Sequence, residues 1–254
     1  MVQSPIRLRV HFSALGNQLQ RIIEPMKMLR ADVAVLFTFS TTDRSQLFLP
    51  KVVEALESSH ILVKIITCNI SETSEVVNEI GSIVTAAPRH EYFFNVSTGP
   101  VNASIAGTIA GMFWKVRPYF IAVDEYKKPI LSEQDFPVIG LPKFIPTFEV
   151  PVLEKQSFYA LEFLVSKGRS CYKREVLSYL EEKGVIGTKA GKSDSDQALQ
   201  GQLNSIIYRL LTWGFVELTD HGKRLTITVT EKGTEGRKMF FHILHPSEPP
   251  DILI

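Results

Sequence analysis

The segment with the clearest capacity for chemistry is 92–100, which reads Tyr-Phe-Phe-Asn-Val-Ser-Thr-Gly-Pro. Its apolar first half predicts a buried strand, and the Ser-Thr-Gly turn leads into a helix of small apolar residues. Backbone N–H groups at a helix N-terminus are unpaired, and the helix dipole adds partial positive charge there. Such a turn suits phosphate or another anion, so we expect a ligand site.

The elements that must position this turn alternate along the first half of the chain. Apolar runs with β-forming residues predict strands over 6–12, 33–39, 61–67, 92–96 and 117–123. Helical spacing predicts helices over 18–29, 45–57, 72–84 and 101–114, with Pro25 and Pro50 as interruptions. Strands that alternate with helices form right-handed βαβ units around a parallel sheet. We therefore predict an α/β fold with a Rossmann-like N-terminal domain.

A second polar turn, Ser-Ala-Leu-Gly-Asn at 13–17, follows the first strand. In a Rossmann-like sheet of order 3-2-1-4-5, ligands bind beyond the carboxyl ends of strands one and four. The two polar turns follow these strands, so we expect one site. Its predicted residues are Ser13, Ala14, Leu15, Gly16, Asn17, Asn95, Ser97, Thr98, Gly99, Pro100 and Asn102. Alternatively, Gly99 only permits a tight turn and close helix packing.

The chain changes character at 129–151, where five prolines break any long helix. We interpret this segment as a connector, with one edge strand around 144–148. The predicted division is a ligand-sensing and dimerisation domain over 1–128, this connector, and a second domain over 152–254.

The second domain shows three helices followed by a hairpin. Helical spacing predicts helices over 157–166, 172–183 and 197–213, and strands over 215–218 and 225–229 flank a glycine turn with a basic tip. A final helix begins near Thr230. This order is the winged helix-turn-helix pattern, in which the second helix of the turn motif enters the major groove of DNA.

The predicted recognition helix is 197–213, and its non-core face carries side chains that hydrogen-bond bases or phosphates. The predicted DNA-binding residues are Gln202, Asn204, Ser205, Tyr208 and Arg209, with Lys223 and Arg224 at the wing tip. From Lys167 to Lys238 the chain has 13 Lys and Arg against nine Asp and Glu, a net +4 that fits double-stranded DNA as partner.

Composition excludes several classes of protein. The 44% hydrophobic content is enough for packed cores, and the net charge of +1 gives no global signal for polyanion binding. Two cysteines, Cys68 and Cys171, build neither a disulfide framework nor a metal site, so we expect a reducing, cytoplasmic setting without metal. No apolar run reaches about 18 residues, so no membrane span is expected. No nucleophile-base-acid set is visible, so no catalytic residue is assigned.

The combination of these two domains resembles a known family. A Rossmann-like domain with an Asn-x-Ser-Thr-Gly turn after its fourth strand, joined to a winged helix, is similar to the CARF (CRISPR-associated Rossmann fold) transcription regulators. The resemblance implies a homodimer that binds a cyclic oligoadenylate through the turns after strands one and four. It also implies promoter binding by the winged helices. Many CARF turns continue with Lys or Arg, whereas Pro100, Val101 and Asn102 follow Gly99 here.

The sequence thus indicates a ligand-responsive DNA-binding regulator that is not an enzyme and has no cofactor besides a cyclic oligoadenylate effector. Two alternatives stay open: a nucleotide-binding protein with weak cyclic oligoadenylate phosphodiesterase (ring nuclease) activity, and a dimeric DNA-binding protein without a ligand. Two further features also have structural interpretations. His11 is expected to be a core or interface histidine, and Gly107 with Gly111 pack either on the sheet or at a subunit interface.

Overall fold

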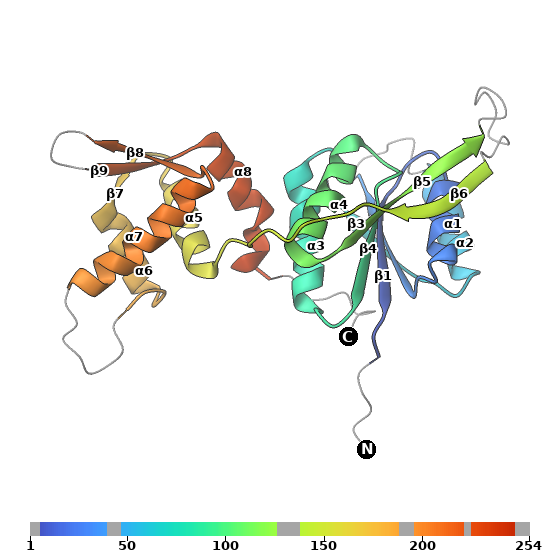
Figure 1. The fold of residues 1–254 in the computed structure, drawn as a ribbon, viewed down its shortest axis with the longest axis horizontal. Helices are drawn as coiled ribbons and strands as arrows, with labels where there is room; N and C mark the ends of the chain where they lie inside the picture. The colour runs from blue at the N-terminus through green and yellow to red at the C-terminus, as the bar shows by residue number, and fades with distance from the viewer. Residues whose placement is uncertain (1–5, 40–46, 126–137, 188–195, 221–224, 247–254) are drawn as a thin grey trace, which may run out of the picture. The chain divides into compact units, whose positions relative to one another are not determined.

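The computed structural model describes residues 6–39, 47–125, 138–187, 196–220 and 225–246 (Figure 1). The chain divides into two compact units. The first extends to Pro151, and the second is Val152–Pro246.

The N-terminal unit is built on a six-stranded sheet of order β3-β2-β1-β4-β5-β6. Its strands are β1 (Arg9–Ala14), β2 (Val33–Thr38), β3 (Leu62–Thr67), β4 (Glu91–Asn95), β5 (Arg117–Glu125) and β6 (Val138–Phe144). The first five are parallel to their neighbours, and β6 pairs with β5 in the antiparallel sense. The predicted Rossmann-like sheet and its 3-2-1-4-5 order are therefore confirmed.

Four helices cover the two faces of this sheet (Figure 1). They are α1 (Gln20–Met28), α2 (Leu49–Glu57), α3 (Thr73–Ala86) and α4 (Val101–Trp114). Helices α1 and α2 pack with residues of β2 through a core that includes Met26, Leu56 and Leu36. Because β2 is covered on both faces, all six of its residues are buried.

Helix α4 approaches the sheet closely because it carries glycine at the contact. A methyl group built on Gly107 would lie 2.2 Å from Cδ1 of Phe94, and one on Gly111 would lie 2.8 Å from the carbonyl oxygen of Val116. Both glycines thus pack within the N-terminal unit, in agreement with the sheet-packing interpretation of these positions.

Two expectations from prolines were wrong. The edge strand does not span 144–148 but is β6, at Val138–Phe144, so part of the predicted connector belongs to the sheet. Pro142 is tolerated there because β6 lies at the sheet edge, where one row of N–H groups has no strand partner. Pro50 does not interrupt α2 but occupies its first turn, where a backbone N–H is not needed.

The C-terminal unit is a winged helix, as predicted. Its elements are α5 (Lys155–Lys167), β7 (Cys171–Tyr172), α6 (Lys173–Glu182), α7 (Asp196–Thr212), β8 (Val216–Asp220), β9 (Leu225–Val229), α8 (Glu231–Met239) and a final 3-10 turn, η2 (Phe241–Ile243). The sheet order is β7-β9-β8. Strand β7 was not predicted, because two residues carry no periodicity. Thr230 caps α8 by accepting a hydrogen bond from the N–H of Gly233 at 3.0 Å.

Candidate functional site

The turns after β1 and β4 meet at a cavity of about 390 Å³ in the N-terminal unit. Residues 15–18 and 97–100 line it together with Arg21, Phe39, Ile70 and Ser71. The structure therefore brings together the two turns that strand order predicts to be neighbours.

Two glycines allow the turns to touch. A methyl group built on Gly16 would lie 2.8 Å from the backbone nitrogen of Gly99. One on Gly99 would lie 2.4 Å from Cβ of Ala14, and the φ of Gly99 is +76°, in the left-handed region that favours glycine. Gly99 is thus required for the turn itself, and it is also exposed at the cavity.

Three polar side chains of the predicted site are buried and hydrogen-bonded within the protein. Ser13 Oγ and Thr98 Oγ1 lie 2.8 Å apart, and Thr98 Oγ1 also donates to the carbonyl oxygen of Ala14 at 2.9 Å. Asn95 Nδ2 donates to the carbonyl oxygen of Arg21 at 2.6 Å. These side chains hold the ends of β1 and β4 and the start of α1 together.

The remaining predicted residues differ in their access to the cavity. Ala14 and Leu15 are buried, although Leu15 contributes to the lining. Ser97 lines the cavity, and its Oγ accepts a hydrogen bond from the N–H of Ile121 at 2.6 Å. Asn102 does not line the cavity but donates from Nδ2 to the carbonyl oxygen of Ser71.

Sequence reasoning missed Arg21, which brings a cation into the cavity from α1. Its Nη1 donates to Oε1 of Gln18 at 2.8 Å, and its Nη2 donates to the carbonyl oxygen of Ile121 at 3.3 Å. Its Nε is buried without a partner in the described structure. Among the described lining residues, Arg21 is the one with a charged side chain. Its position in the first turn of the helix after the 13–17 turn was the available signal.

His11 lies inside the sheet rather than at the cavity. Its ring stacks on Phe93 with centroids 4.5 Å apart, and its Nδ1 lies 3.3 Å from the hydroxyl oxygen of Tyr119. Burial, helped by the charge of Arg9, lowers the pKa of His11 to about 3, so the ring is neutral at physiological pH. This placement agrees with the core interpretation of His11.

The cysteines and acidic residues of the described segments form no metal centre. Cys68 and Cys171 are free thiols. Burial, with the nearby carboxylates of Glu79 and Glu75, raises the pKa of Cys68 to about 12. Within the described ranges no group of three His, Cys, Asp or Glu residues is placed to hold a metal ion. In the same ranges, no helix combines the length and apolar character needed to cross a membrane.

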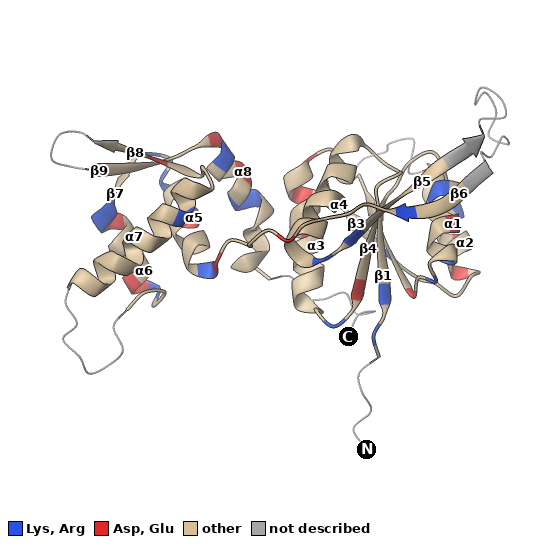
Figure 2. Cartoon of the chain, viewed as in Figure 1, with Lys and Arg blue, Asp and Glu red and all other residues tan. Residues whose placement is uncertain are grey.

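In the C-terminal unit, α7 presents the face predicted to bind DNA. Gln202, Asn204, Ser205 and Tyr208 are exposed, and the opposite face packs in the core. Between 197 and 212 this helix has no acidic residue, and Figure 2 shows it as largely uncharged. The predicted wing-tip residues Lys223 and Arg224 lie outside the described residues.

Two α7 side chains already have partners. Asn204 Oδ1 accepts a hydrogen bond from Lys173 Nζ at 3.0 Å. Because lysine only donates, the oxygen of this amide must face Lys173, which leaves the NH₂ group to donate to a ligand. Arg209 forms an ion pair with Glu154. Arg209 therefore has a partner within the C-terminal unit, and its contact with DNA stays a prediction.

Two family matches agree with these two units. Residues 9–126 match the family described as HFX_2341_N-like, N-terminal. Residues 156–240 match the DUF6293 C-terminal winged helix domain. No functionally curated protein matches the sequence.

Solved structures with partial similarity include three proteins. Csm6 from Enterococcus italicus, bound to cyclic hexa-2'-fluoro-hexa-dAMP, is 13% identical, with a TM-score of 0.41, and the alignment covers 82% of this chain and 56% of that one. Can2 from Sulfobacillus thermosulfidooxidans, in complex with cyclic tetra-adenylate, is 9% identical with a TM-score of 0.41 and coverages of 92% and 65%. VC1899 from Vibrio cholerae is 13% identical with a TM-score of 0.40 and coverages of 94% and 66%.

The chain spans less than two thirds of the length of each of these structures. The assignment of the two domains therefore rests on the two family matches. Residues 9–126 therefore form an HFX_2341_N-like N-terminal domain, and residues 156–240 form a DUF6293 C-terminal winged helix domain.

Proposed function

We propose that the chain is a ligand-responsive transcription regulator of the cytoplasm, which binds a cyclic oligoadenylate in its N-terminal domain and DNA through its winged helix. The observation that carries the proposal is the cavity in which the two polar turns meet beside the guanidinium of Arg21. The resemblance to CARF regulators supplies the ligand class, and the cavity supplies the chemistry that such a ligand requires.

That chemistry is anion recognition. The turn at 97–100 precedes α4, so backbone N–H groups and the positive end of the helix dipole lie at the cavity. Arg21 adds the positive charge that Pro100, Val101 and Asn102 do not provide. The ring of Phe39 supplies an apolar surface suited to a base. One cavity thus offers contacts for both the phosphate and the base of a nucleotide.

The size of the cavity favours a homodimer. Its volume of about 390 Å³ is near the lower end of the roughly 300–1,000 Å³ of drug-sized ligand pockets. A ring of four or six nucleotides needs more room, which a second copy of the chain can add. At the start of α4, Val101 is 73% exposed and Ile105, one turn later, is 46% exposed. We propose that this apolar stripe faces the partner subunit.

Helix α4 is the proposed route from the ligand to the winged helix. It begins at the cavity turn, and near its end the carbonyl oxygen of Met112 accepts a hydrogen bond from the N–H of Val150 at 2.9 Å. Lys115, which caps α4, pairs with Glu149 at 3.1 Å. Val150 immediately precedes the last residue of the N-terminal unit, Pro151. Movement of α4 on ligand binding would therefore act on the segment that leads into the winged helix.

The described cavity residues give no support to the phosphodiesterase alternative. None of them has a carboxylate or imidazole group that could act as a general base. The hydroxyl groups of Ser97 and Thr98 are engaged in the hydrogen bonds described above.

Calorimetric titration of the full chain with cyclic tetra-adenylate and cyclic hexa-adenylate tests the proposal. We expect saturable binding of at least one ring at one ring per two chains. Absence of heat with both rings contradicts the proposed ligand, and a stoichiometry of one ring per chain contradicts the shared site. Incubation followed by separation of cyclic and linear products distinguishes a sensor from a ring nuclease.

A further inference from the structure

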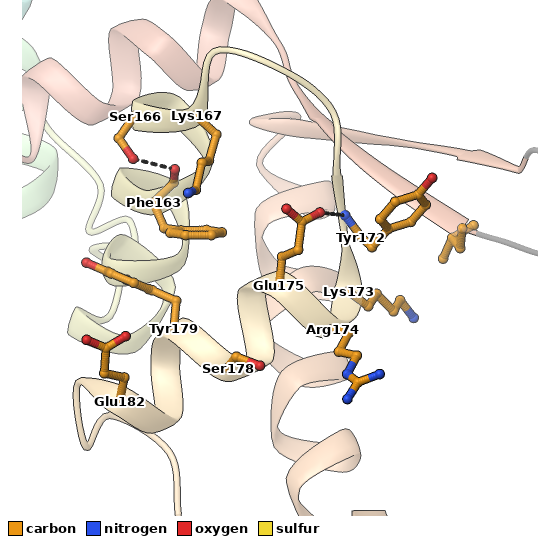
Figure 3. Close-up of a pocket in the computed structure, with 11 residues that line it drawn as sticks. Phe163, Ser166, Lys167, Tyr172, Lys173, Arg174, Glu175, Ser178, Tyr179 and Glu182 are labelled. Carbon is orange, nitrogen blue, oxygen red and sulfur yellow. Dashed lines mark hydrogen bonds between the residues drawn. The ribbon is translucent and has the colours of Figure 1, made fainter.

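The C-terminal unit has a groove of about 1060 Å³ beside the start of α6 (Figure 3). Residues from the end of α5, from β7 and from α6 line it, with Leu225 of β9. The predicted DNA-binding residues of α7 are not part of its lining.

Three cations surround this groove: Lys167 on α5, and Lys173 and Arg174 at the start of α6. None of the three forms an ion pair with a described residue. Two carboxylates, Glu175 and Glu182, also line the groove. Glu175 is paired outside the set of three cations, because it accepts hydrogen bonds from Arg169 Nη2 at 2.6 Å and from the N–H of Tyr172 at 2.8 Å, which leaves Glu182 as the one lining carboxylate to set against the three cations. The groove therefore presents a surplus of positive charge.

Three aromatic residues line the groove, and Phe163 and Tyr179 pack against each other whereas Tyr172 is exposed. Phe163 and Tyr179 stack on each other with centroids 4.5 Å apart, and Lys167 Nζ lies 5.1 Å from the centroid of the Phe163 ring. Figure 3 shows this pair on one side of the groove.

The position of Lys173 relates this groove to the predicted recognition helix. Its Nζ donates to Asn204 on the exposed face of α7, so the cationic rim continues the surface predicted to bind DNA. In helix-turn-helix proteins the first helix of the motif, here α6, crosses the DNA backbone while the second enters the major groove. The cations that line the groove and the position of α6 as the first helix of the motif therefore both indicate the phosphate backbone of DNA as the ligand.

We propose that this groove holds the sugar-phosphate backbone of duplex DNA, with Lys167, Lys173 and Arg174 as phosphate contacts. This inference rests on the proposed DNA-binding function and extends the footprint from α7 across α6 to the end of α5. Lys173 has a second role as a positioning residue, because it fixes the amide orientation of Asn204.

The test is the salt dependence of DNA affinity, since each phosphate contact contributes about 0.9 to the slope of log K against log salt concentration. The probe is a fluorescent 24-base-pair duplex of arbitrary sequence, because phosphate contacts do not depend on sequence. Wild-type full chain is compared with the double variant K167Q/R174Q. The control is K155Q, an exposed lysine at the other end of α5 that does not line the groove.

The double variant should lower the magnitude of the slope by about 1.8. Raising the salt concentration from 50 to 200 mM should therefore reduce the DNA affinity of the double variant about 12-fold less than it reduces the affinity of the wild type. K155Q should keep the wild-type slope, and circular dichroism should show all three proteins folded. If the double variant keeps the wild-type slope, the groove is not a phosphate site although DNA binding stands. If the wild-type chain binds no duplex at 50 mM salt, either alone or with saturating cyclic tetra- or hexa-adenylate, the proposed function itself is refuted.

Discussion

Replacement of Arg21 by Gln tests the ligand cavity at its one described charged side chain. The guanidinium is held by Gln18 and by the carbonyl oxygen of Ile121, so it is positioned before the ligand arrives and loses little freedom on binding. A hydrogen bond to a charged group contributes about 1.5–3 kcal/mol. At about 1.4 kcal/mol per factor of ten, R21Q should weaken cyclic oligoadenylate binding by roughly 10- to 150-fold.

Stability should change much less than affinity. The contact from Arg21 to Ile121 is long, at 3.3 Å, so we expect its loss to cost no more than a typical hydrogen bond contributes to folding, about 0.5–1.5 kcal/mol. The matched control is K27Q, which removes a cation at the other end of α1, where Lys27 pairs with Glu24 at the surface. Isothermal titration calorimetry gives Kd, and thermal unfolding shows that each variant is folded. Equal affinity of R21Q and wild type would refute the assignment of Arg21 as the anion contact.

Three further predictions concern packing, pH and the DNA interface. G107A should destabilise the protein by about 1–3 kcal/mol because its methyl group would overlap a buried aromatic ring, whereas G201A, with open space around it, should stabilise it by about 0.5–1 kcal/mol. Urea unfolding measures both changes in the free energy of unfolding, and changes of the same sign would contradict the packing. The pKa of His11 is about 3 in the folded protein and 6.5 in the unfolded chain, so the stability that its neutral ring contributes is complete above pH 6.5 and is lost as pH falls. From pH 6.5 to 5.0 the free energy of unfolding of the wild type should fall by up to about 2 kcal/mol more than that of H11Q. Equal losses in the two proteins would count against a buried neutral ring. R209A should weaken DNA binding by about 1–3 kcal/mol if this side chain contacts a base, and E154Q, which releases Arg209 from its ion pair, should tighten binding. Fluorescence anisotropy measures both affinities. If neither variant changes the affinity, Arg209 has a structural role alone.

The parts of the fold that depend on local pattern could be predicted from the sequence. The continuous apolar run of β2 and the polar turns after β1 and β4 indicated a parallel sheet with one switch point, and the sheet order agrees. The strand β6 was misplaced, because its identity depends on pairing with β5 rather than on its own pattern. Pro50 was misjudged because the start of α2, which makes that position favourable, lies four residues after the predicted start.

The site was predictable as a place but not as a set of side chains. Polar residues near the turns were all taken as ligand contacts, yet Ser13 and Thr98 use their hydroxyl groups to join β1 and β4. Arg21 was missed because its role depends on how α1 folds back over the two turns. Likewise, the ion pair between Arg209 and Glu154 links residues 55 positions apart, which no local pattern reveals.

The central claim is that a ligand in the N-terminal domain changes DNA binding by the winged helix, and one measurement tests it directly. A duplex is selected from a random pool with the full chain, and its affinity is measured by fluorescence anisotropy with and without saturating cyclic tetra- or hexa-adenylate. Allosteric coupling of about 1–3 kcal/mol predicts a change in Kd of roughly 5- to 150-fold with one of the rings. The same Kd with and without each ring, under conditions in which calorimetry shows the ring bound, would contradict the claim.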